Sequence, residues 1–339
     1  MYCFMIKSSF LSSSFLMFAA NLFNSVANYI LQIFFARFFS MEDYGTYNAV
    51  NSLTFFFVFI TTPLQNFTIK NVIAVKEDNR KLSQLFSFYN KRFFFYVSLL
   101  SIPFAIMMFF TGIMTQIPGL YVLEIITMCI IANLYTSYSA LLSGLQLFKK
   151  LAVVIFIFTI IRFFSFIIFL LSKASLSHIM LLAVLLAIVN CVLCYFAIPK
   201  AIRILKENKD FTEFNFLYKD FVLYLLKTGF IYFIFRALMQ SDTLLVKYFF
   251  SDYETGIYSS ASIFGKAIIY LSGAIVMVLF PLVSENTTKD ISSFALLLKA
   301  LGINLLLSGG GALFLFLFPS LITFLFGSAF TEAQFIIKY

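Results

Sequence analysis

Long apolar runs recur along the whole chain, and they constrain its fold more than any other feature. We expect membrane-spanning segments near residues 10–36, 46–69, 93–111, 121–144, 151–171, 177–198, 221–249, 256–282 and 300–318, with another beginning near 332. A helix needs about 20 mostly apolar residues to cross a bilayer core. Only helices and closed barrels satisfy their backbone in lipid, and runs this long and uniformly apolar favour helices. The sequence therefore predicts an all-α polytopic membrane protein with about nine or ten spans.

The composition agrees with this prediction and excludes several other classes. The chain is 62% hydrophobic and 12% charged, unlike an ordinary soluble globular protein. Cys191 and Cys194 form a CxxC motif, but it lies inside an apolar run without a second pair, which is typical of small residues in a helix rather than of a zinc or redox site. We predict no metal site and no cofactor. Motifs of soluble-style catalysis are absent from the sequence.

Basic residues alternate between the connections and predict the orientation. Successive connections between spans lie on alternate sides of the membrane. The connections on one side hold only Arg37 and Lys173. Those on the other side, including the N-terminal segment, hold Lys7, Lys70, Lys76, Arg80, Lys81, Lys91, Arg92, Lys149, Lys150, Lys200, Arg203, Lys206, Lys209, Lys219, Lys289 and Lys299. The positive-inside rule then places the N-terminus in the cytoplasm. The net charge of +9 reflects this topology and contact with anionic lipids, and it predicts no nucleic-acid partner.

A short segment, expected to be a loop, occurs twice in the sequence. FFSMEDYGTY at residues 38–47 returns as FFSDYETGIY at residues 249–258, with Gly45 matching Gly256 and Tyr47 matching Tyr258. Both copies are expected on the outer side, six spans apart, so the two copies have the same orientation. That pattern predicts two parallel six-helix halves related by an axis along the membrane normal. We expect Gly45 and Gly256 to form a tight turn before the next helix, since glycine allows unusual backbone angles.

The repeat also predicts the domain organisation. We expect an N-terminal six-helix lobe at residues 1–198, a polar cytoplasmic linker at 199–219 and a C-terminal lobe at 220–339. Pro63-Leu64 and Pro281-Leu282 both fall near the inner end of the span that follows the repeated loop. The second lobe contains fewer spans than the first, so the chain is expected to be a fragment or a truncated product.

Three stretches resemble a known family. They are SMEDYGTYNAV at 40–50, QSDTLLVKYFFSDYETGIYSSASIFGKAIIYLSGAIVMVLFPLVSE at 240–285 and LFGSAFTEA at 325–333. With these the chain resembles the Wzx-type polysaccharide flippases of the MATE-like exporter superfamily, over essentially its whole length. The resemblance implies two lobes around a V-shaped cavity, alternating access, and location in the bacterial inner membrane. It also implies an undecaprenyl-pyrophosphate-linked oligosaccharide as cargo, with a polysaccharide polymerase and a chain-length regulator as further candidate partners beside membrane lipids.

Charges inside the spans are the first candidates for the site, because a charge in lipid is costly and usually faces a cavity or a partner. The cations are Arg162, Arg236 and Lys266, and the acids are Asp242 and Glu124. An excess of deep cations favours an anionic cargo, and the planar fork of arginine binds phosphate oxygens bidentately. Asp242 and Glu124 are candidates for ion coupling or for salt bridges. The family often has an acid at the place of Asp242.

Polar stripes are the second indication of a cavity. Three spans carry polar residues three or four positions apart, which share one helix face, and a fourth adds polar residues at its outer end. The stripes are Asn21, Asn24, Asn28 and Gln32; Tyr47, Asn48 and Asn51; Arg236, Gln240, Thr243 and Lys247; and Ser259, Ser262, Lys266 and Tyr270. Polar contacts between packed helices are the alternative explanation. Lys247 is also explained by snorkelling at a span end.

Three other functions remain open at this stage. A drug or cation antiporter would need an acid-rich cavity, whereas the charges here are mostly basic. A membrane-embedded polysaccharide polymerase would need a large outer loop with catalytic arginines or paired aspartates, and the outer connections are short. The third alternative is a truncated, inactive product.

Overall fold

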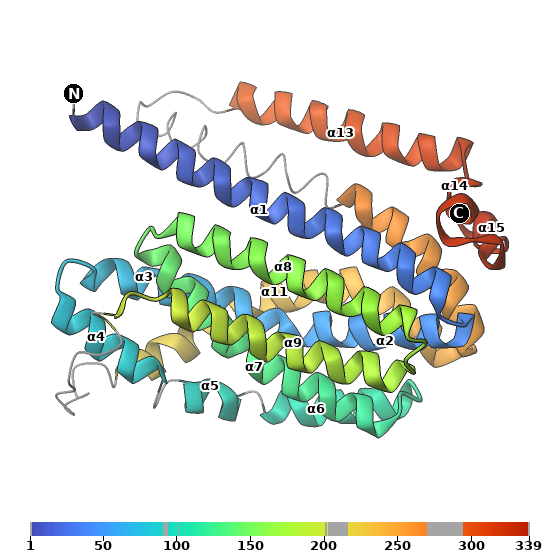
Figure 1. Ribbon diagram of the computed structural model, residues 1–339, viewed down its shortest axis with the longest axis horizontal. Coiled ribbons are helices and arrows are strands. Elements are labelled where there is room, and N and C mark those ends of the chain that lie inside the picture. The colour runs from blue at the N-terminus through green and yellow to red at the C-terminus, as the bar shows by residue number, and fades with distance from the viewer. Residues whose placement is uncertain are drawn as a thin grey trace. The chain divides into compact units, whose positions relative to one another are not determined.

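The computed structural model describes residues 2–90, 94–100, 102–200, 202, 216–269 and 294–337. All regular structure in these ranges is helical (Figure 1). Six helices among the described residues are long and apolar enough to cross a membrane, namely Met41–Val75, Gly119–Gly144, Phe148–Leu171, Leu176–Ala197, Lys219–Phe249 and Leu298–Leu317. The predicted all-α, polytopic membrane fold is confirmed.

The chain divides into two compact units. Unit 1 comprises Met1–Phe38 and Ala49–Phe249, and unit 2 comprises Phe39–Asn48 and Phe250–Tyr339. Most of the expected linker, residues 201 and 203–215, lies outside the described residues, as do Pro281-Leu282 and Tyr270. The lobes at 1–198 and 220–339 therefore stay a prediction.

Unit 1 is a bundle of helices around an aromatic and aliphatic core. Helix α8 packs against α1 and α9, α7 packs against α3 and α9, and α11 packs against α3. Leu64, Phe88, Leu142, Cys194 and Phe221 are among its buried side chains. The helices are α1 (Tyr2–Phe38), the later part of α2 (Met41–Phe57), the 3-10 helix η1 (Val58–Ile60), α3 (Thr61–Val75), α4 (Asn79–Phe88), α5 (Phe94–Leu100), α6 (Ile102–Met114), α7 (Gly119–Gly144), α8 (Phe148–Leu171), α9 (Leu176–Ala197) and α11 (Phe216–Phe249).

One expected span is not a uniform helix. The 3-10 helix η1 separates α2 from α3, and Pro63 lies in the first turn of α3. Proline lacks the N–H group that a helix interior needs, but the first turn tolerates this loss. Within the expected span at 93–111 the structure describes α5 and α6, and residue 101 between them lies outside the described residues.

The outer surface of these helices is apolar. Leu226 and Leu238 of α11 are 71% and 73% exposed, and Phe164 and Ile168 of α8 are 58% and 62% exposed. A monomer in water does not expose apolar area on this scale, whereas lipid chains would cover it. Many of the 49 phenylalanines thus occupy lipid-facing or core positions.

Unit 2 is built around three aromatic side chains. Tyr44 at the start of α2 lies 5.4 Å from Phe330 and 6.1 Å from Phe326 between ring centroids, and the two phenylalanines lie 5.6 Å apart. All three are buried. Its elements are residues 41–48 of α2, the helical residues 252–269, α13 (Phe294–Leu317), α14 (Leu321–Phe326), the 3-10 helix η4 (Ser328–Phe330) and α15 (Ala333–Ile336). The run expected to begin near 332 starts with α15.

Candidate functional site

A polar cluster joins α1 to α8 within unit 1. Nη2 of Arg162 donates hydrogen bonds to Oδ1 of Asn24 at 3.1 Å and to Oδ1 of Asn28 at 2.5 Å. Asn24 and Asn28 are one helical turn apart, so both amides face the same neighbour. Oγ1 of the fully buried Thr159 lies 3.0 Å from the same oxygen of Asn24 and 2.7 Å from the backbone oxygen of Ile155, and its single hydrogen can be donated to either. The structure therefore brings together three residues that the sequence singled out on two separate spans.

Neutral groups orient the guanidinium of Arg162. Both oxygens belong to neutral amides, which accept these hydrogen bonds from the guanidinium. The ring of Phe158 has its centroid 5.5 Å from Cζ of Arg162, within the range of a cation–π contact. Arg162 is half-buried and Asn28 is exposed. This arrangement can hold a positive charge in a fixed orientation on the candidate membrane-spanning helix α8, as an anion site requires.

Helix α11 carries the predicted polar stripe that begins at Arg236. Gln240, Thr243 and Lys247 are 5%, 2% and 4% exposed, and Arg236 is half-buried. The stripe is therefore turned inward, as the sequence predicted for a polar face. Lys247 differs from the expectation of a snorkelling side chain at a span end, because it is buried. Lysine is rarely buried without a purpose, so Lys247 joins the candidate residues.

The two candidate acids have different surroundings. Asp242 is half-buried on α11, and its Oδ1 accepts a long hydrogen bond of 3.4 Å from the Thr243 hydroxyl. Glu124 is half-buried on α7, and its Oε2 has no hydrogen-bond partner among the residues that the structure describes. The choice between ion coupling and salt bridging stays open for both residues.

The remaining predicted cavity residues are Asn51 and Lys266. Asn51 lies on α2 in unit 1 and is half-buried. Lys266 is half-buried in unit 2, and Ser259, on the same helix face, is 2% exposed. Arg162 and Arg236 belong to unit 1, so a single cationic site that joins them with Lys266 remains a prediction.

The two copies of the repeated loop meet each other inside unit 2. A Cβ atom built on Gly45 would collide with the backbone oxygen of Asp252 and lie 2.7 Å from the backbone nitrogen of Gly256. A Cβ atom built on Gly256 would collide with the backbone oxygen of Met41 and lie 3.5 Å from the nitrogen of Gly45. Met41 and Asp252 are themselves equivalent positions of the repeat. The contact is thus reciprocal, as a two-fold relation between equivalent segments requires.

This contact corrects the expected role of the two glycines. Gly45 lies within α2 and Gly256 within the helical residues 252–269, so neither forms a tight turn before a helix. Among the described residues, Gly327 is the glycine with a positive φ angle, 108°. Gly45 and Gly256 are required for a different reason, because two backbones approach too closely for any side chain.

The repeated serines begin the two helices. The Ser40 hydroxyl accepts a hydrogen bond from the backbone N–H of Asp43 at 3.1 Å, and the Ser251 hydroxyl accepts one from Glu254 at 3.3 Å. In the second copy the Glu254 carboxylate accepts from the backbone N–H of Ser251 at 2.9 Å and from its hydroxyl at 2.8 Å, which completes a capping box. These hydrogen bonds, the backbone one first, lower the pKa of Glu254.

Among the described residues no group of three or more metal-binding side chains is found. Cys191 and Cys194 are free and buried in the core of unit 1. Thr159 is the residue of the polar cluster around Arg162 that was not predicted from the sequence, whereas Lys247 belongs to a predicted polar stripe. Thr159 precedes Arg162 by three positions, so its place on the same helix face was available from the spacing.

The comparisons with known proteins give one match. The family described as "Polysaccharide biosynthesis protein" matches residues 10–287. The comparisons with curated proteins and with solved structures gave no significant match. The matched segment includes both copies of the repeated loop and all predicted cavity residues, and it covers well over half of the chain. The chain therefore belongs to the polysaccharide biosynthesis protein family, the family of Wzx-type flippases and MATE-like polysaccharide exporters.

Proposed function

We propose that this protein flips an undecaprenyl-pyrophosphate-linked oligosaccharide, a unit of O-antigen, capsule or exopolysaccharide, across the bacterial inner membrane. The family supports transport of polysaccharide units in general. The observation that carries the finer proposal is the Arg162 cluster. A guanidinium inside a membrane-spanning helix, oriented by the oxygens of Asn24 and Asn28, suits the pyrophosphate of a lipid carrier.

Arg236 and Lys266 would extend this positive region, and Gln240 and Asn51 would contact the sugars. A basic region attracts an anion and disfavours an organic cation, which distinguishes this proposal from a drug antiporter. Flipping moves an existing molecule and breaks no bond, so these residues need only bind, orient and release. We propose the N-terminus on the cytoplasmic side, following the distribution of basic residues.

Alternating access would proceed by rocking of the two repeats about their shared axis. The reciprocal contact of Gly45 with Gly256, on the predicted outer side, would keep that side closed while the cargo enters from the cytoplasm. Opening outward would separate the two glycines. A polysaccharide polymerase and a chain-length regulator would then receive the flipped units.

The proposal is tested in cells from which the gene has been deleted. We expect lipid-linked sugar units to accumulate on the cytoplasmic leaflet and surface polysaccharide to disappear. The unmutated gene should restore both, whereas Arg162→Gln should fail to do so at an equal protein level. Arg37→Gln, which removes an exposed arginine at the end of α1, is the matched control and should restore both. Unchanged intermediates in the deleted cells would refute the flippase proposal.

A further inference from the structure

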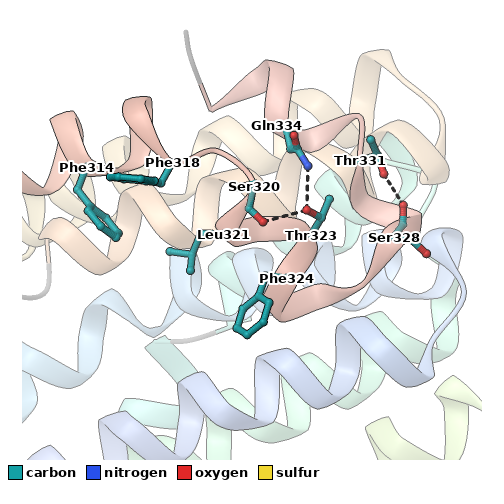
Figure 2. A pocket seen from close by; sticks show the side chains of 9 residues that line it. All are labelled: Phe314, Phe318, Ser320, Leu321, Thr323, Phe324, Ser328, Thr331 and Gln334. Atoms are coloured by element: carbon teal, nitrogen blue, oxygen red, sulfur yellow. Dashed lines mark hydrogen bonds between the residues drawn. The ribbon is translucent and has the colours of Figure 1, made fainter.

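A hollow of about 710 Å³ lies at the end of α13 within unit 2 (Figure 2). This volume falls in the range of roughly 300–1,000 Å³ that is usual for small-molecule sites. None of the residues named so far as candidates for cargo binding lines it. Its lining consists of Phe314, Phe318, Ser320, Leu321, Thr323, Phe324, Ser328, Thr331 and Gln334. It is thus separate from the charged and polar stripes described above.

The fold fixes the walls of this hollow. Phe326 and Phe330 point into the aromatic core of unit 2, where they contact Tyr44. Gly327, with φ of 108°, lets the chain reverse between α14 and η4. Because Phe326 and Phe330 are buried in this core, residues next to them in the chain, such as Phe324 and Ser328, are exposed. The hollow is therefore framed by short helices that the buried core holds in place.

Its polar groups form a connected set. The Thr323 hydroxyl donates to the backbone oxygen of Ser320 at 2.9 Å and accepts from Nε2 of Gln334 at 2.8 Å, as Figure 2 shows. The Thr331 hydroxyl donates to the backbone oxygen of Ser328 at 2.6 Å. A hydroxyl that donates its only hydrogen to a carbonyl presents acceptor lone pairs to a ligand. The wall therefore favours a ligand rich in O–H donors.

Its apolar part is aromatic. Phe314 and Phe318 have ring centroids 5.2 Å apart, and they are 49% and 54% exposed. An aromatic face carries negative charge density, so it attracts the polarised C–H groups on one face of a sugar ring. The lining contains no charged side chain, which disfavours an anion. Hydroxyl acceptors, one amide and aromatic faces together are the chemistry that recognises a neutral sugar.

We propose that this hollow is a binding site for a neutral hexose unit. The inference rests on the proposed function, because a transported oligosaccharide supplies such units. By the predicted topology the hollow lies on the outer side, where the sugars of a flipped cargo emerge. Phe318 stacks on the sugar ring, and Thr323, Thr331 and Gln334 hydrogen-bond its hydroxyls.

The test measures binding directly and needs no transport. Methyl glycosides of glucose, galactose and mannose are titrated against the full chain in detergent micelles, with binding followed by saturation-transfer NMR. We expect at least one of them to bind, and Thr323→Val and Phe318→Leu each to weaken it about five- to tenfold, the effect of one lost hydrogen bond or one lost ring face. Phe316→Leu is the matched control, since Phe316 is 53% exposed near the end of α13, two residues before Phe318, but outside the lining. It should bind as the unmutated chain does.

Two results would overturn the site: no binding by any of the glycosides, or equal binding by Phe318→Leu and Phe316→Leu. Competition by inorganic phosphate or by phosphatidylglycerol vesicles would also overturn it, because an uncharged site should ignore both. The circular dichroism spectrum of each variant confirms that it is folded. Glycoside binding by a chain that does not flip lipid-linked sugar would keep the site and refute the proposed function, so the two failures are distinguishable.

Discussion

Gly45 and Gly256 occupy equivalent positions in two loops far apart in the sequence, and each leaves room for the backbone of the other loop. The nitrogen of Gly256 lies 2.7 Å from the place where a Cβ of Gly45 would be, and the carbonyl oxygens of Asp252 and Met41 block the two Cβ positions. The repeat thus encodes a contact between its own two copies. We propose that this contact closes the outer side of the transporter and separates when that side opens.

The first prediction concerns these glycines. Gly45→Ala and Gly256→Ala should each lower the free energy of unfolding by about 1–3 kcal/mol, because the new methyl group overpacks against backbone that cannot move alone. Thermal unfolding in detergent, followed by circular dichroism, measures the change. Gly265→Ala is the control, since nothing lies within 4 Å of its Cβ position. Equal unfolding temperatures for Gly45→Ala and Gly265→Ala would contradict the close approach.

The second prediction concerns the capping box and pH. Hydrogen bonds from Ser251 lower the pKa of Glu254 in the folded state. Stability from this contact is therefore present above the ordinary pKa of a glutamate, and it is lost as the pH falls through the lower folded value. The protection factors of amides in the first turn of the helix at 252–269, which compare exchange with the intrinsic rate at the same pH, should fall over that acid range.

Two variants test whether Glu254 is the cause of that acid response. Glu254→Gln should remove the additional pH dependence of exchange in this turn, whereas Glu332→Gln, which changes an exposed carboxylate in unit 2, should leave it unchanged. The same pH dependence in Glu254→Gln and in the unmutated chain would show that the capping box is not responsible.

The third prediction concerns the Arg162 cluster. A double-mutant cycle of Arg162→Gln and Asn28→Ala should give a coupling free energy of about 0.6–1.7 kcal/mol, the range seen for polar contacts between membrane helices. Unfolding in mixed micelles provides the free energies. Replacing Asn28 by Ala should also weaken binding of a pyrophosphate-bearing lipid, because the guanidinium loses one of its two orienting oxygens. Additive effects, with no coupling, would contradict the hydrogen bond.

Much of this protein could be predicted from its sequence. The lengths of the apolar runs predicted an all-helical membrane fold, because lipid leaves the backbone few alternatives. The spacing of Asn24 and Asn28 placed both on one face. The contact of Arg162 with these two residues was not predictable, since the spacing of residues within one helix does not identify the helix that packs against it.

Where the structure differs from the sequence predictions, each difference has a specific physical cause. The expected span at 46–69 contains the 3-10 helix η1 just before α3, a change of helix type that hydropathy alone does not indicate. The position of Lys247 near a span end suggested snorkelling, but its burial depends on what α11 packs against. Gly45 and Gly256 were recognised as a pair, yet the reason for them lies in a contact between distant segments, which leaves no local signal.

The central claim is that this chain moves an anionic lipid-linked sugar with the help of Arg162. The most direct measurement uses vesicles that contain the purified protein and a fluorescent undecaprenyl-pyrophosphate-linked sugar in both leaflets. An impermeant quencher then reports how much of the lipid reaches the outer leaflet over time. We predict rapid exchange between leaflets with the unmutated chain, at least tenfold slower exchange with Arg162→Gln, and no slowing with Arg37→Gln. Exchange no faster than in empty vesicles would contradict the proposed function, and equal exchange by Arg162→Gln would contradict the role of the Arg162 cluster.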